Sequence, residues 1–123
     1  MEINHSFGQI ERSTPTLFCL LLGIAHGVID ASSGFLLFSS TPLNHVLDIF
    51  ILYNLIAFAL QPMVGSFIDS FWIPSKGVIA GLLLMALAIL ISMIHPIPAI
   101  LLAALASALF HVGGGALAVL LNP

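Results

Sequence analysis

Apolar residues fill four long runs of the chain, and short polar or proline-containing breaks separate these runs. The runs extend from about residue 15 to 39, 46 to 68, 77 to 94 and 98 to 121. A helix needs about 20 apolar residues to cross the roughly 30 Å hydrocarbon core of a bilayer. The pattern therefore predicts an all-α membrane protein, with residues 1–123 forming one integral membrane segment of four transmembrane helices.

Each break carries residues that end or start helices. Residues 40–44 and residues 70–75 combine serine, proline and other turn-forming residues, and Trp72 suits the headgroup interface. Pro96 and Pro98 follow His95. Because proline lacks a backbone donor and disfavours helical geometry in the residue before it, this segment predicts the end of one helix and the first turn of the next.

Composition agrees with a bilayer environment. Hydrophobic residues make up 60% of the chain and charged residues 6%, and the mean hydropathy is +1.21. A water-soluble globular fold is excluded by these values. Arg12 and Lys76 are too few to neutralise a row of phosphates, which excludes nucleic acid as a main partner. Cys19 is the single cysteine, and no catalytic or cofactor motif occurs, so we expect neither an enzyme nor a bound cofactor.

The two basic residues predict the orientation. Arg12 precedes the first run and Lys76 lies between the second and third, which places both on one side of the membrane. We therefore expect a multi-pass protein of the cell membrane. The positive-inside rule places both ends of the chain on the cytoplasmic side. A cleaved signal peptide is not expected, because Glu2 and Glu11 make the leading segment net acidic.

Asp30 is the most informative polar residue because it lies inside the first run. His26 precedes it by four positions and Ser33 follows it by three, so the three share one helical face. Ionisable side chains within a membrane helix usually mark a site or pathway. We interpret Asp30 and His26 as a pair that loads and releases a proton; a carboxyl that only packs against a neighbouring helix is the alternative.

His111 gives the fourth run a similar feature, with Ser107 one turn earlier. At about 1.5 Å per residue, His26 lies about 16 Å from the start of the first run and His111 about 15 Å from the end of the fourth. The two side chains are therefore predicted to face each other across one cavity. Two alternatives stay open: a core histidine satisfied by a hydroxyl or backbone group, and a pair of axial haem ligands.

The remaining helices differ in polarity. Asn54 and Gln61 share a face of the second run and are further candidates for substrate or proton contact. Residues 77–91 carry no polar side chain, so the third helix is expected to face lipid around most of its circumference. Small residues at four-residue spacing predict close helix packing. They are Gly23, Gly27 and Ala31, then Gly77 and Gly81, then Ala104 and Ala108.

Four segments of the chain match positions of a known family. They are His26 to Asp30, Gln61 to Asp69, Gly81, and Phe110 with His111. In these segments the chain resembles the first four helices of major facilitator superfamily transporters, and within that superfamily the fosmidomycin-resistance-type drug exporters of bacteria. The likeness extends from about residue 17 to 121 and covers about a third of a twelve-helix fold, so it implies an N-terminal fragment.

The resemblance implies secondary transport of a small molecule, coupled to protons, with efflux by antiport favoured. It assigns proton-coupling or substrate contacts to Asp30 and His26, a cavity contact to His111, and gate-loop positions to Gly65 and Asp69. The implied partners are the lipid bilayer, the substrate, protons, and either the missing helices or a second copy of the chain. Two other functions stay open: a complete four-helix exporter acting as a dimer, and a membrane protein that does not transport.

Overall fold

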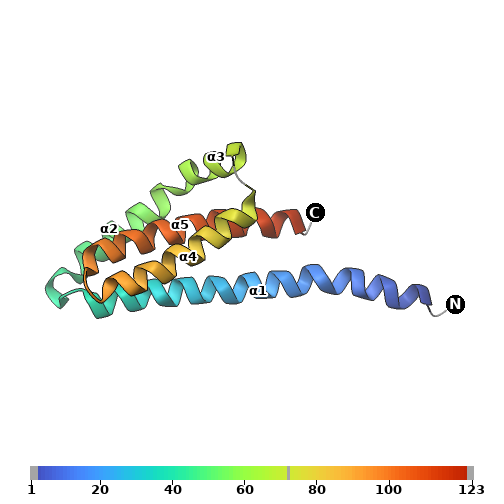
Figure 1. Ribbon diagram of the computed structural model, residues 1–123, viewed down its shortest axis with the longest axis horizontal. Coiled ribbons are helices and arrows are strands. Elements are labelled where there is room, and N and C mark those ends of the chain that lie inside the picture. Colours follow the sequence, from blue (N-terminus) through green and yellow to red (C-terminus); the bar gives the residue numbers. More distant parts are fainter. Residues whose placement is uncertain (1–2, 72, 122–123) are drawn as a thin grey trace.

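A computed structural model describes residues 3–71 and 73–121, with side chains described from Pro15 onward. Helices run back and forth along one direction (Figure 1). They are α1 (Ile3–Ser40), the short 3-10 turn η1 (Leu43–His45), α2 (Val46–Ala59), α3 (Gln61–Phe71), α4 (Pro74–Ser92) and α5 (Pro96–Leu121). The described residues thus form an all-α membrane protein, with four helical stretches long and apolar enough to span a bilayer.

The helix boundaries follow the sequence pattern closely. Pro74 occupies the start of α4 and Pro96 the start of α5, positions where a missing N–H removes no helical bond. The first helix begins earlier than predicted, at Ile3, and contains Pro15, where its apolar stretch starts. Arg12 lies in this leading part and its side chain is outside the described residues, as is Trp72.

The second predicted helix is divided into α2 and α3 at Leu60. Pro62 lacks an N–H and cannot bond the carbonyl of Phe58, so the helical ladder is interrupted one turn before it. Past this break α3 diverges from α5 (Figure 1). It also continues to Phe71, so Asp69 lies on a helix and not in the loop that the sequence predicted for it.

Helix α5 is the centre of the bundle and contacts α1, α2, α3 and α4. Its closest neighbour is α4, through Gly77 and Gly81 facing Gly113 and Phe110. A Cβ atom on Gly81 would lie 2.8 Å from the carbonyl oxygen of Ala106. The predicted packing role of Gly77 and Gly81 is confirmed. In contrast, Gly23 and Gly27 have nothing within 4 Å of the position of a Cβ, so the same spacing in α1 is not used for packing between the described helices.

The third helix leaves most of its surface free, as expected, but it is not the most exposed of the four stretches. About 28% of the apolar window of α4 is buried, against 11% for the stretch Leu43–Phe71. The absence of polar side chains indicated lipid, but Gly77, Gly81 and Ala88 let α4 sit directly against α5, where apolar helices also pack. The most exposed stretch is the divided second one.

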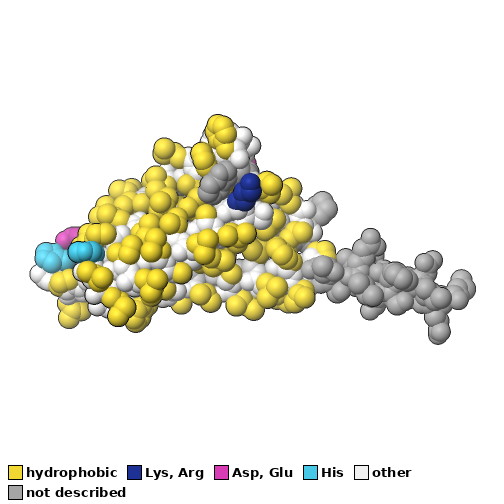
Figure 2. Space-filling model, viewed as in Figure 1, with side chains coloured by type: hydrophobic (Ala, Val, Ile, Leu, Met, Phe, Trp, Pro, Cys, Tyr) yellow, Lys and Arg dark blue, Asp and Glu magenta, His cyan; other side chains and the backbone are white. Residues whose placement is uncertain are grey.

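Hydrophobic side chains cover most of the face seen in Figure 2, over the length of the bundle. Exposed ones come from each helical stretch, including Phe35 of α1, Leu55 of α2, Leu83 of α4 and Val119 of α5. Such a surface is unfavourable in water and suits the hydrocarbon core of a bilayer. Ionic and histidine side chains near the connections include His45 and Asp48, which form a pair at 4.0 Å.

Thr41, between α1 and η1, gives a stability prediction. Thr41 is 7% exposed, and its Oγ1 atom is buried without a hydrogen-bond partner. Because an unsatisfied buried hydroxyl costs free energy, replacing it by a methyl of similar shape should stabilise the fold. We expect Thr41→Val to raise the free energy of unfolding by about 1 kcal/mol, measured by denaturation in detergent micelles. A decrease would mean that the hydroxyl is bonded in the folded protein.

Candidate functional site

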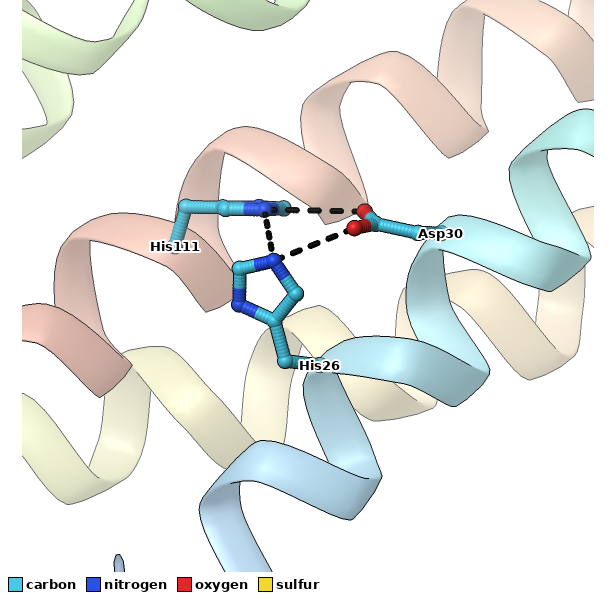
Figure 3. A group of neighbouring side chains, drawn as sticks. All are labelled: His26, Asp30 and His111. Atoms are coloured by element: carbon cyan, nitrogen blue, oxygen red, sulfur yellow. Dashed lines mark hydrogen bonds and ion pairs between the residues drawn. The ribbon is translucent and has the colours of Figure 1, made fainter.

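Three ionisable side chains meet between α1 and α5, and we call them the His–Asp cluster: His26, Asp30 and His111 (Figure 3). His26 Nε2 lies 3.1 Å from Asp30 Oδ2 and 3.3 Å from His111 Nε2. His111 Nε2 lies 3.6 Å from Asp30 Oδ1. The sequence separation between the two histidines is 85 residues, so the cluster exists only in the folded bundle.

Helix geometry explains why these residues meet. His26 and Asp30 are four residues apart on α1, which places both side chains on one face. His111 lies ten residues before the end of α5 at Leu121 and His26 eleven after Pro15, so both are about 15 Å inside their helical spans. This equal depth is what the sequence predicted. The cluster therefore lies in the middle third of the spans.

The backbone of α5 fixes the orientation of His111. Its Nδ1 lies 2.7 Å from the carbonyl oxygen of Ser107, and a carbonyl only accepts, so Nδ1 carries a proton and donates it. The hydroxyl of Ser107 is 3.2 Å from the same nitrogen. In the neutral imidazole, Nε2 then has a free lone pair, and this lone pair faces His26 and Asp30.

The acceptor atoms of the cluster need a shared proton or a cation between them. A neutral His111 offers a lone pair from Nε2 and an ionised Asp30 offers carboxylate oxygens, and both groups are acceptors. A proton on His26 Nε2 can be donated to Asp30 at 3.1 Å or to His111 at 3.3 Å. Without such a proton or another cation, three electron-rich groups would repel one another. A neutral His26 with its proton on Nε2 can supply this donor, and a bound cation could take the same place.

A cavity of about 310 Å³ adjoins the cluster. Its lining comes from two turns of α1 and three of α5, and consists of Cys19, Leu22, Gly23, His26, Phe110, His111, Gly114, Gly115 and Ala118. The rings of Phe110 and His26 pack edge to face, with their centroids 6.3 Å apart. The lining is mostly apolar with two imidazoles at one side, which is the usual character of a small-molecule site.

The members of the cluster differ in exposure. The side chain of His111 is 24% exposed, whereas those of His26 and Asp30 are 51% and 53% exposed. His26 and His111 border the cavity, whereas Asp30 does not. His111 is also held by contacts to Ser107 on its own helix.

The other predicted site residues lie elsewhere. Asn54 donates to the carbonyl of Phe50 on its own helix at 2.8 Å, and Gln61 is half-buried at the start of α3. Gly65 is half-buried, and a Cβ built on it would lie 3.8 Å from Val112. Asp69 is exposed near the end of α3. None of these lines the cavity, so their roles in substrate contact or gating stay predictions.

Sequence reasoning missed the apolar members of the cavity. Cys19 was not among the candidate site residues, yet it lines the cavity, and Phe110 entered only through the family likeness. One signal was available, because Cys19, Gly23 and His26 follow the three- and four-residue spacing of one helical face. A face that combines a histidine with small residues can border a cavity as well as pack.

Comparison with protein family models, with curated proteins and with solved structures gives no match for this chain. The resemblance to major facilitator transporters therefore rests on four segments of the sequence alone, from His26 to Asp30, from Gln61 to Asp69, at Gly81, and at Phe110 with His111. Independent support for a function comes from the location of the His–Asp cluster and from the cavity beside it.

Proposed function

We propose that the protein acts in secondary transport of a small molecule across the cell membrane, driven by a proton gradient. The observation that carries this proposal is the meeting of two histidines and an aspartate from two helices at mid-span, next to a cavity of about 310 Å³. Ionisable groups at this depth cost free energy, so they are rare and usually mark a pathway or coupling site. A substrate in the cavity would contact His26 and His111 directly, so its binding and the occupancy of the cluster would be linked.

Export by antiport is the favoured direction, with both chain ends in the cytoplasm. The start of α1 and the end of α5 lie toward the same end of the bundle (Figure 1), which supports placing both on one side of the membrane. Transporters commonly hold substrate and coupling ion near the bilayer midplane and open alternately to the two sides. The moving partner would be either further helices, as the family resemblance implies, or a second copy of the chain, as in a small dimeric exporter.

The geometry favours a coupling site over a haem site. Two axial histidines bind on opposite faces of a porphyrin, with the ring plane between them. Here the imidazoles touch, with ring centroids 4.4 Å apart and planes inclined at 72°, and Asp30 contacts both. A porphyrin has no place between them.

Transport in inside-out membrane vesicles tests the proposal. We expect an imposed inside-acid gradient to drive uptake of at least one class in a panel of lipophilic cations, organic acids and sugars. A protonophore should abolish this uptake, and vesicles from cells without the protein provide the control. Gradient-independent behaviour of all three classes would contradict the proposal.

A further inference from the structure

The facing atoms of the His–Asp cluster have the spacing of ligands in a metal site. The two Nε2 atoms are 3.3 Å apart, and each contacts one oxygen of the Asp30 carboxylate: His26 contacts Oδ2 at 3.1 Å and His111 contacts Oδ1 at 3.6 Å. One ligand atom from each residue can be chosen so that all three lie within 4.8 Å of one another. In a tetrahedral zinc site with metal–ligand bonds of about 2.0–2.1 Å, neighbouring ligand atoms lie about 3.3 Å apart. We propose that His26, Asp30 and His111 bind one divalent transition-metal ion of the zinc class, through the two Nε2 atoms and the carboxylate.

The contact behind His111 is a second and independent indication. Histidines that ligate metals almost always donate the other ring N–H to a carbonyl, carboxylate or water, which fixes the ring and directs the lone pair at the metal. The 2.7 Å contact from His111 Nδ1 to the carbonyl oxygen of Ser107 has this form. It directs the His111 lone pair toward His26 and Asp30.

The ligand set selects the class of ion. Two imidazoles and one carboxylate suit zinc and the neighbouring first-row divalent metals, whereas magnesium and calcium prefer ligand sets made of oxygen alone. One carboxylate offsets part of the charge of a divalent ion, and neutral imidazoles bind it without adding charge. The ion would take the place that a bridging proton otherwise occupies between His26 and Asp30.

A fourth coordination position is open. Both histidines border the cavity, so a water molecule there could provide the fourth ligand of a tetrahedron. Sites with three protein ligands and one exchangeable position characterise ions that react or exchange, while structural zinc sites use four protein ligands. The half-exposed side chain of His26 lies at the border between the cavity and the cluster.

Zinc titration of the purified protein in detergent micelles, against a fluorescent chelator as competitor, tests the site. We expect one Zn²⁺ per chain and no binding of Mg²⁺. Loss of an outer-shell partner alone weakens metal sites about 10- to 100-fold, so His111→Gln should weaken zinc binding at least tenfold. His26→Gln should do the same, and it provides a second reading if the first variant fails to fold.

His45→Gln is the matched control, since His45 forms the other described histidine–carboxylate pair, 4.0 Å from Asp48. Zinc should bind this variant as tightly as the unmodified protein and raise the Tm of both, but not that of His111→Gln. Equal zinc affinity in His111→Gln, loss of binding in His45→Gln, or no stoichiometric binding at all would overturn the proposal. The titration needs no gradient or substrate, so its failure is distinguishable from failure of the transport proposal.

Discussion

Asp30→Asn is expected to reduce gradient-driven transport to the level of membranes that lack the protein. The substitution keeps the size of the side chain and its ability to accept from His26 at 3.1 Å, but it removes the only carboxylate of the cluster. The asparagine amide carries no charge to offset a bound cation, and it cannot exchange a proton. Substrate exchange without a gradient should persist, because the cavity lining does not include Asp30.

Asp48→Asn is the matched control for this prediction. Asp48 lies in the first turn of α2, and its side chain is 80% exposed, outside the cluster. Transport by this variant should equal that of the unmodified protein at equal amounts of protein in the membrane. Undiminished gradient-driven transport in Asp30→Asn would remove Asp30 from the coupling mechanism.

Gly81→Ala is expected to destabilise the helix bundle strongly, although it adds only one methyl group. A Cβ at this position would lie 2.8 Å from the carbonyl oxygen of Ala106 and 2.8 Å from the backbone nitrogen of Phe110. Backbone atoms of a helix cannot move aside separately, so α4 and α5 must separate along their contact. Overpacking of this kind costs about 1–3 kcal/mol, and denaturation in detergent micelles should show a loss near the upper value.

Gly34→Ala makes the same chemical change where space is available. Nothing lies within 4 Å of the position that its Cβ would take, and alanine is a better helix former than glycine by about 1 kcal/mol. This variant should be as stable as the unmodified protein or more stable. If both variants were destabilised equally, the close packing of α4 on α5 would not be the cause.

Hydropathy predicted the helices well because the bilayer requires long apolar stretches with satisfied backbones. Each predicted span was found, the second as two helices, and Pro74 and Pro96 start helices as proline does at a first turn. Periodicity and depth also predicted that His26 and His111 would meet. These inferences depend on local spacing and on length along a helix, and both can be calculated from residue positions in the sequence.

The remaining features depend on which helices become neighbours. Gly77 and Gly81 pack whereas Gly23 and Gly27 do not, although the spacing is the same. The division at Leu60 needed the observation that Pro62 removes a bond to Phe58 in the middle of an otherwise continuous apolar run. Sequence spacing shows that a helical face can pack closely. Whether it does so depends on which helix lies against that face in the fold.

Proton movement driven by a substrate gradient is the most direct test of the central claim, that the His–Asp cluster couples a cation to transport. The protein is reconstituted into liposomes that contain a pH-sensitive dye, and a transported compound from the vesicle panel is applied on one side without any pH difference. We predict that the internal pH changes as the compound crosses, and that Asp30→Asn shows no such change. Passage of the compound without proton movement would contradict the account.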